Sequence, residues 1–268
     1  MLTFVGLGLW DERSVTVAGR DAIRAADRCF AEFYTSRLMG TSVADLERFH
    51  ETEIEVRDRA GVEQTPAPIL EAAEAGDTVF LTAGDPMIST THVDLRLRAH
   101  ERDVDTRIVH APTAQAAASS LTGLQNYRFG KATTLPFPRS HGGEGVPDSV
   151  LATIEGNLER DLHTLVYLDI AAGAETSADD TGVSDEAFMS GSTAAGLLAN
   201  GWRPEPLAVV VARAGSPEPV VVADRLEKHA ERDFGGPLHL LIVPAELHHM
   251  EAEALGRLAG APDSLLPD

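Results

Sequence analysis

The chain has 268 residues and 43% of them are hydrophobic, which is enough for a substantial core in one large or two modest domains. The formal net charge of −20 argues against nucleic-acid binding through a basic face, and a single cysteine excludes intrachain disulfides and cysteine-based zinc fingers. No apolar run approaches the roughly 20 residues of a membrane span, and the N-terminus lacks the basic start of a signal peptide, so we expect a cytoplasmic protein.

Lysine occurs only at Lys131 and Lys228, while acidic residues are spread along the whole sequence. This distribution favours adaptation to a cytoplasm with molar salt, where the Debye length falls to about 3 Å and self-repulsion is screened. An acidic surface for a basic partner is the alternative interpretation.

Strand-like and helical patterns alternate through the first half of the chain. We expect helices at residues 14–26, 43–49, 66–75 and 91–101, and strands at 3–6, 28–33, 78–82 and 106–110. Ser14 is the expected N-cap of the first helix. The alternating order predicts a mainly parallel sheet covered by helices.

A break near Ala111-Pro112 divides the chain into two expected α/β domains, 1–112 and 113–268. In the second domain we expect strands at 164–170, 207–212, 219–223 and 238–243, and helices at 113–122, 148–159, 191–199 and 245–258. Residues 136–147 have the composition of a loop. The acidic, small-residue segment 171–184 predicts an exposed excursion.

Gly84-Asp85-Pro86 follows the apolar, partly β-branched strand 78–82. Gly84 permits a sharp turn or a close ligand, and Pro86 biases Asp85 away from the helical region. The carboxylate is therefore expected at the carboxyl end of a strand, where open α/β sheets bind ligands. A plain turn with Asp85 as a cap is the alternative.

Other candidate sites carry weaker signals. Gly6-Leu7-Gly8-Leu9 resembles half of a dinucleotide fingerprint, but Asp11 stands where the third glycine is needed, so a Rossmann NAD site is disfavoured. A threonine before His92 is expected to cap the following helix, with His92 either pointing into a ligand cleft or partly exposed beside the cap. His239 fits a ligand contact through its ring or backbone. Adjacent His248 and His249 point in different directions along a helix, so we expect no metal site there.

Nine segments together resemble the diphthine synthase family of the tetrapyrrole-methylase superfamily. They occur in the family's order over nearly the whole chain: Phe4-Val5-Gly6-Leu7-Gly8-Leu9, Glu32-Phe33-Tyr34-Thr35-Ser36, Gly84-Asp85-Pro86 with Thr90-Thr91-His92, Gly123-Leu124-Gln125-Asn126-Tyr127-Arg128-Phe129-Gly130, His163-Thr164-Leu165 with Leu168-Asp169-Ile170, Ala212-Arg213-Ala214-Gly215, and Pro237-Leu238-His239.

The resemblance implies two α/β domains with a cofactor cleft between them, a homodimer, and methyl transfer from S-adenosyl-L-methionine, which leaves S-adenosyl-L-homocysteine. The implied substrate is translation elongation factor 2 bearing a 3-amino-3-carboxypropyl-histidine. Trimethylation of its amine forms diphthine in diphthamide biosynthesis. No nucleic acid, membrane or metal is implied as a partner.

Carried over residue by residue, the resemblance implies eight cofactor positions, several acting through backbone groups: Leu9, Asp85, Ile88, Thr113, Ala114, Leu168, Ala214 and His239. The family usually has Ser-Ile at Thr113-Ala114, so a hydroxyl is kept and some packing is lost. It often has a lysine at Ala171, whose loss could alter substrate contacts. The sequence identifies no catalytic base, and we assign no catalytic residue.

Two other functions stay open at this point. The chain could be a methylase of the same superfamily that acts on a tetrapyrrole or corrinoid precursor or on ribosomal RNA. It could also be an acidic binding module that keeps the fold without turnover.

The acidic composition predicts that the protein loses structure at low salt, because repulsion among its carboxylates is then unscreened. Circular dichroism before and after dialysis from molar salt into dilute buffer measures this. An unchanged spectrum would contradict the interpretation.

Overall fold

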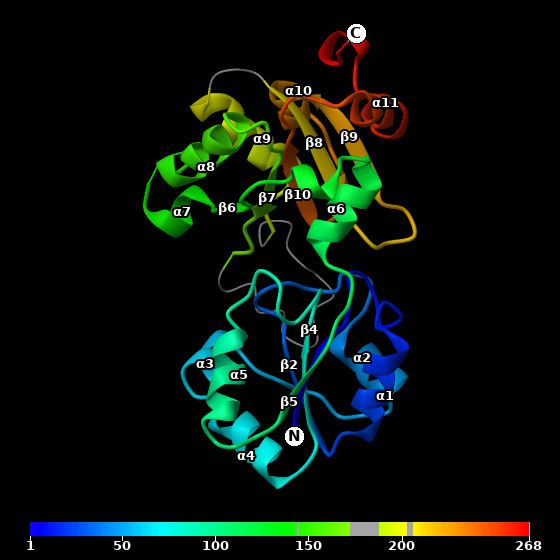
Figure 1. Ribbon diagram of the computed structural model, residues 1–268, viewed down its shortest axis with the longest axis vertical. Helices are drawn as coiled ribbons and strands as arrows, with labels where there is room; N and C mark the ends of the chain where they lie inside the picture. The colour runs from blue at the N-terminus through cyan, green and yellow to red at the C-terminus, as the bar shows by residue number, and fades with distance from the viewer. Residues whose placement is uncertain (144, 172–187, 203–205, 268) are drawn as a thin grey trace. The chain divides into compact units, whose positions relative to one another are not determined.

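The computed structural model describes residues 1–143, 145–171, 188–202 and 206–267, and it divides the chain into two units, Met1–Ala114 and Gln115–Asp268. Each unit has its own five-stranded sheet (Figure 1). The expectation of an α/β fold is confirmed. No helix in the described ranges is long and apolar enough to span a bilayer.

The sheet of the first unit has the order β3-β2-β4-β1-β5, and its paired strands are all parallel. Its strands are β1 (Leu2–Gly6), β2 (Arg28–Glu32), β3 (Glu55–Val56), β4 (Thr78–Thr82) and β5 (Thr106–Val109). Both β1 and β4 are buried along their whole length, as strands covered on both faces should be. The predicted parallel sheet is therefore confirmed.

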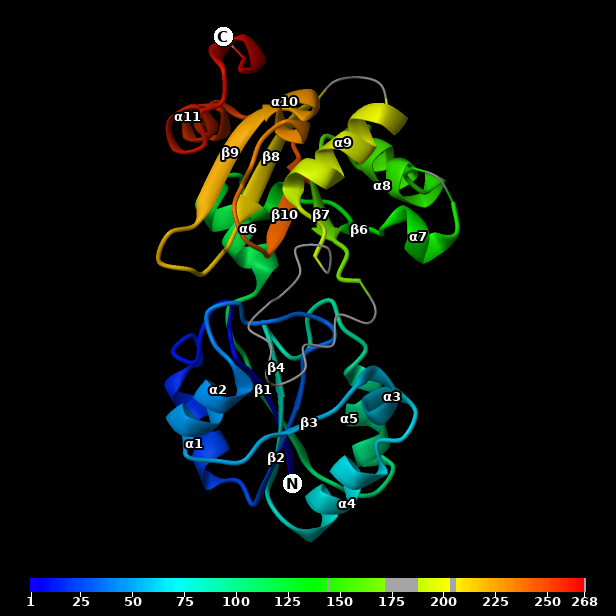
Figure 2. The same ribbon diagram turned by 180° about the vertical axis from the view of Figure 1, so that it is seen from behind.

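Helices cover both faces of this sheet. Figures 1 and 2 show α1 (Val17–Ala25) and α2 (Val43–His50) on one side, and α3 (Arg59–Glu63), α4 (Ala67–Ala75) and α5 (Val93–His100) on the other. Successive side chains of a strand point to opposite faces of the sheet and pack in different helix layers. Val5 is in the cluster with Ile23 of α1, whereas Phe4 is in the cluster with Leu70 of α4.

Several predicted helix starts are wrong by two to four residues. Helix α1 begins at Val17, because Thr16 is its N-cap and accepts a 3.1 Å hydrogen bond from the Gly19 N–H. Ser14 instead accepts bonds from backbone N–H groups of the preceding loop. Helix α5 begins at Val93, and no threonine caps it. The short elements β3 and α3 were not predicted.

The second sheet has the order β6-β7-β10-β8-β9 and is mostly antiparallel, with only β6 and β7 paired in parallel. Its strands are β6 (Thr133–Leu135), β7 (Thr164–Leu168), β8 (Leu207–Ala212), β9 (Val220–Arg225) and β10 (His239–Val243). β8 and β9 follow each other through a short connection, which permits an antiparallel pair without a crossover helix.

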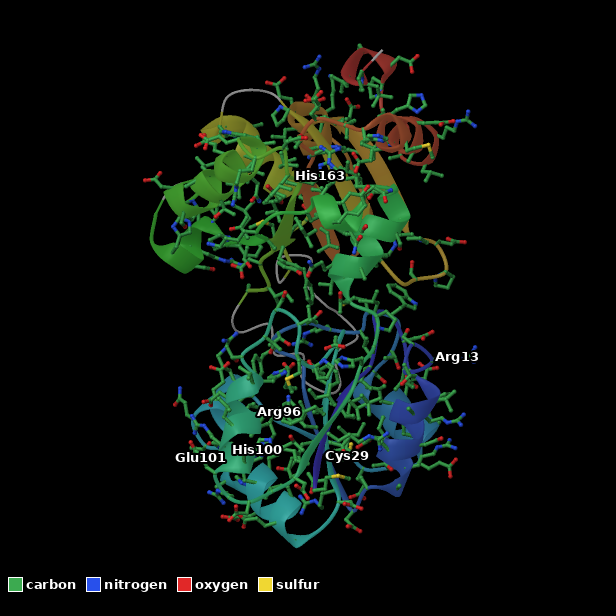
Figure 3. All side chains as sticks on the ribbon, viewed as in Figure 1. Arg13, Cys29, Arg96, His100, Glu101 and His163 are labelled. Atoms are coloured by element: carbon green, nitrogen blue, oxygen red, sulfur yellow. The ribbon has the colours of Figure 1, made fainter. Side chains whose placement is uncertain are left out.

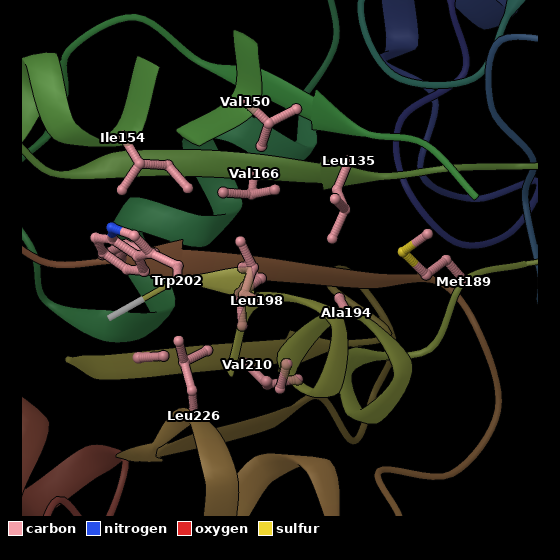
Figure 4. Close-up of a cluster of buried hydrophobic side chains, with 14 of the residues drawn as sticks. Leu135, Val150, Ile154, Val166, Met189, Ala194, Leu198, Trp202, Val210 and Leu226 are labelled. Atoms are coloured by element: carbon pink, nitrogen blue, oxygen red, sulfur yellow. The ribbon is translucent and has the colours of Figure 1, made fainter. Parts of the chain in front are cut away.

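The helices of the second unit are α6 (Ala114–Thr122), α7 (Pro138–His141), α8 (Asp148–Leu158), α9 (Gly191–Gly201), α10 (Leu226–Ala230) and α11 (His249–Leu258). The helical turns are η1 (Asn126–Arg128) and η3 (Asp263–Leu265). Helices α8 and α9 lie on one side of the sheet, and α6 and α11 on the other (Figures 1 and 2). Figure 4 shows the core on the α8–α9 side, where Ile154, Leu198 and Trp202 meet the strand residues.

Two expectations for this unit need correction. The segment 136–147, expected as a loop, contains the short helix α7. The last helix begins at His249 rather than Ala245, because His248 is its N-cap and forms a capping box with Glu251. Of the acidic segment 171–184, all but Ala171 lies outside the described residues.

A buried carboxylate holds the second unit together across long sequence separations. Glu251 is fully buried; its Oε1 accepts bonds from the Gln125 N–H at 2.9 Å and from His163 Nε2 at 3.0 Å. Its Oε2 accepts from Arg128 Nη1 at 2.5 Å and from the His248 N–H at 2.9 Å. Figure 3 shows His163 inside this unit. Burial acts to raise the pKa of Glu251, but these hydrogen bonds outweigh it and lower the pKa.

We expect Glu251→Ala to destabilise the protein by about 3–5 kcal/mol, because Nη1 of Arg128, Nε2 of His163 and the N–H groups of Gln125 and His248 all lose their acceptor. Glu253→Ala is the matched control on the same helix. Its carboxylate is exposed and pairs with Arg257 at 2.8 Å one turn along the helix, so its loss should cost about 0.3–0.5 kcal/mol. Denaturant unfolding at constant high salt measures both, and equal losses for the two variants would contradict this role.

Candidate active site

The carboxyl edge of the first sheet collects five of the eight predicted cofactor positions. Leu9 follows β1, Asp85 and Ile88 follow β4, and Thr113 and Ala114 follow β5. These three strands are neighbours and parallel, so the loops after them meet at one edge. Ligands of open parallel sheets bind at such an edge.

Glycine allows two of these loops to touch. The Gly84 N–H donates to the Gly8 carbonyl at 2.7 Å, and the Gly8 N–H donates back to the Gly84 carbonyl at 3.4 Å. A Cβ at Gly6 would lie 2.4 Å from the Gly84 carbonyl oxygen, so only glycine fits there. The glycines after β1 therefore serve the close approach of two loops.

Asp85 joins the loop after β4 to the end of β5. Its Oδ1 accepts a 3.0 Å bond from the Met87 N–H. Its Oδ2 accepts from His110 Nδ1 at 2.8 Å and from the Ala111 N–H at 3.3 Å. The Asp85 side chain is 4% exposed and that of His110 is 73% exposed. We did not predict His110, although its place at the end of the predicted strand 106–110 was a signal for this edge.

A second buried pair braces the same edge at the end of β2. Glu32 is fully buried and accepts bonds from the backbone N–H and hydroxyl of Thr35 and from the Thr82 hydroxyl. His92 Nε2 lies 3.4 Å from Glu32 Oε1, and its Nδ1 donates to the Pro86 carbonyl at 3.2 Å. Burial lowers the pKa of His92, against the opposing effect of Glu32. The expected choice between a ligand-facing and a half-exposed His92 was wrong, because the ring is buried and braces the loop after β4.

Buried hydroxyls without a partner lie at this edge. Tyr34 Oη and Thr90 Oγ1 are inaccessible to solvent and make no hydrogen bond within the described part of the chain. Burial, followed by the charge of Glu32, raises the pKa of Tyr34 above its usual range. A neutral hydroxyl of this kind is a donor and acceptor that a bound ligand could use.

The other three predicted positions lie together in the second unit. His239 begins β10 and pairs with Ala212 at the end of β8, while Leu240 pairs with Tyr167, one residue before Leu168. Ala214 follows two residues after the end of β8. Leu168, Ala214 and His239 therefore share one edge of the second sheet.

The His239 ring makes both of its hydrogen bonds inside the protein. Nδ1 accepts from the Gly191 N–H at 2.9 Å, and Nε2 donates to the Gly236 carbonyl at 2.9 Å. Burial lowers the pKa of His239, which keeps the ring neutral. We expected His239 to contact a ligand through its ring or its backbone. Both ring nitrogens are bonded within the protein, so the backbone is the part that could contact a ligand.

The residues at the edge of the first sheet fit a small ligand that has apolar and polar parts. A Cβ at Gly84 would meet nothing within 4 Å, so the turn faces open space. Ile88, three residues after Asp85, is 45% exposed, which is high for a large apolar side chain beside a buried turn. In the described residues no group of three or more His, Cys, Asp or Glu side chains could hold a metal ion.

Comparisons with known proteins agree on one family. The family model of tetrapyrrole (corrin/porphyrin) methylases matches residues 1–230. Diphthine synthase of Halorubrum lacusprofundi is 66% identical over 268 residues, all of both chains. Diphthine synthase of Halobacterium salinarum is 67% identical over 266 residues, 99% of this chain and all of the relative.

Solved structures agree with these sequence relatives. A crystal structure of diphthine synthase superposes with a TM-score of 0.87 at 37% identity, over 98% of each chain. That of a putative diphthine synthase from Entamoeba histolytica gives 0.81 at 27% identity, over 98% of this chain and 99% of the other. The close relatives also support the halophilic interpretation of the acidic composition. With such matches over its full length, the chain belongs to the diphthine synthase family of the tetrapyrrole methylases.

Proposed function

We propose that this chain transfers methyl groups from S-adenosyl-L-methionine to the amine of the 3-amino-3-carboxypropyl-histidine of translation elongation factor 2. Three transfers give the trimethylammonium of diphthine. The observation that carries this proposal is the end-to-end identity of 66–67% with proteins named diphthine synthase. We also propose that the enzyme is a cytoplasmic homodimer.

The cofactor supplies a methyl group bound to a positively charged sulfur, which an amine can attack directly. The chain's task is then to bind and orient both partners, and positioning alone can lower the barrier by about 7–11 kcal/mol at best. We propose that the five positions at the edge of the first sheet and the three in the second unit contribute to cofactor binding. At His239 we propose that the backbone contacts the cofactor, because both ring nitrogens already form hydrogen bonds within the protein.

The contacts of Asp85 define its part in this proposal. Its carboxylate already accepts from Met87, His110 and Ala111, so it acts on the cofactor mainly by holding the loops after β4 and β5 in place. The exposed Ile88 and the open space at Gly84 then present an apolar contact and bare backbone to the cofactor.

The two competing functions predict different results in one assay. The protein is incubated with methyl-labelled S-adenosyl-L-methionine and, in parallel, with the aminocarboxypropyl form of elongation factor 2, a tetrapyrrole precursor and ribosomal RNA. We expect label only in elongation factor 2, with mass spectrometry showing three methyl groups on the modified histidine. Label in the tetrapyrrole or RNA would replace our proposal by another methylase activity, and label in none of them would favour a binding module.

Asp85→Ala should weaken cofactor binding at least about tenfold, because the two loops lose their common acceptor. The free energy of unfolding should fall by about 1–3 kcal/mol, since the partly buried N–H groups of Met87 and Ala111 lose their acceptor. Calorimetric titration with S-adenosyl-L-methionine and denaturant unfolding measure the two effects. Asp94→Ala is the control, because that carboxylate is exposed and pairs with Arg98 on α5, away from Asp85. Equal cofactor affinity in the two variants would show that Asp85 has no part in binding.

A further inference from the structure

The Asp85–His110 pair combines a buried carboxylate with an exposed imidazole. The two side chains are joined by the 2.8 Å bond between His110 Nδ1 and Asp85 Oδ2, and they are 73% and 4% exposed. Asp85 itself cannot swing away, because the Met87 and Ala111 N–H groups also bond to its carboxylate. The ring of His110 is therefore held by a fixed acceptor while the rest of it faces outward.

This bond determines which ring nitrogen carries the proton. An ionised carboxylate only accepts hydrogen bonds, so Nδ1 of His110 must be the donor. In the neutral ring, Nε2 then has a free lone pair. The same arrangement of a buried carboxylate, an oriented imidazole and a free Nε2 produces a general base in enzymes of other folds.

His110 lies where the proposed cofactor positions gather. It follows β5 at the carboxyl edge and precedes Thr113 by three residues. Its neighbour Ala111 packs beside Gly6 at the end of β1, since a Cβ at Gly6 would lie 2.7 Å from the Ala111 Cβ. The imidazole is thus on the same edge as Leu9, Asp85 and Ile88.

Other groups near the edge are poorer bases. Glu32 and His92 are buried: Glu32 accepts from Thr35 and Thr82, and His92 donates to the Pro86 carbonyl. The Asp85 carboxylate is itself enclosed. The Tyr34 hydroxyl stays protonated, because burial raises its pKa. His110 combines an accessible nitrogen with a fixed orientation.

We propose that Nε2 of His110 is the general base that deprotonates the substrate amine, an inference that rests on the proposed function. Nε2 takes a proton from the substrate ammonium, and the electrons of that N–H bond remain on nitrogen as a lone pair. The lone pair forms a bond to the methyl carbon as the carbon–sulfur bond breaks, and that bond's electrons stay on sulfur. Nε2 then releases its proton to water.

The proton balance requires this step in every round. Each methylation of the primary, secondary and tertiary amine starts from an ammonium that must lose one proton before it can attack, so three methyl transfers release three protons and consume three cofactor molecules. The quaternary product has no N–H left, and the base has no further role. Asp85 stabilises the imidazolium that forms in each round.

His110→Asn tests the base directly, because the asparagine amide can still donate to Asp85 but has no basic nitrogen. We expect the rate of methyl transfer to elongation factor 2 to fall at least about 100-fold. Affinity for S-adenosyl-L-methionine by calorimetry and the melting temperature should stay near the wild-type values. His100→Asn is the matched control, because His100 is an exposed histidine bonded to Thr106 at the opposite end of β5 (Figure 3).

Nitrogen NMR of the unliganded protein gives a second test that does not depend on activity. At a pH where His110 is neutral, the proton should be on Nδ1, and Asp85→Asn should remove this preference. A proton on Nε2, or a His110→Asn variant whose transfer rate is within about threefold of wild type, overturns the proposal. If wild type methylates none of the offered substrates, the proposed function fails, and the general-base role fails with it whatever the NMR result.

Discussion

The edge of the first sheet depends on one buried carboxylate. Asp85 accepts bonds from the loop it belongs to and from the end of β5, two strands away in the sheet order. Without a common acceptor, the partly buried N–H groups of Met87 and Ala111 would need water or other partners, at a cost of up to about 1–3 kcal/mol each. The position of the loops and the orientation of His110 therefore follow from the same interaction.

Close backbone contact is the second constraint at this edge. The paired N–H and carbonyl groups of Gly8 and Gly84 bring the loops after β1 and β4 together, at positive φ angles of 78° and 72°. This explains why a glycine pattern that resembles half of a dinucleotide fingerprint occurs in a methyltransferase. The glycines allow two loops to approach closely at the edge of a parallel sheet, and nucleotide-binding folds require the same close backbone approach.

Local signals predicted the strands well and the polar networks poorly. The bounds of β4 match the prediction at 78–82, because an apolar, β-branched run buried on both faces leaves few alternatives. The start of α1 was misplaced, since Ser14 is the better cap by type but its hydroxyl is bonded to the preceding loop, and Thr16 caps the helix instead. The bond between His163 and Glu251 spans 88 positions and has no local signature. The Gln125–Arg128 segment indicated the family correctly, yet its contacts support the core of the second unit.

The division between buried and exposed polar groups is what suits this protein to methyl transfer. A reaction with an already activated methyl group needs little covalent chemistry from the enzyme, so rigidity of the binding edge matters most. Glu32, His92 and Asp85 are buried, and their hydrogen bonds hold the loops at this edge in place. Only a proton has to leave the substrate in each round, and one oriented imidazole suffices for that. His110, held by a carboxylate that already serves the loops, adds this capacity without a further buried charge.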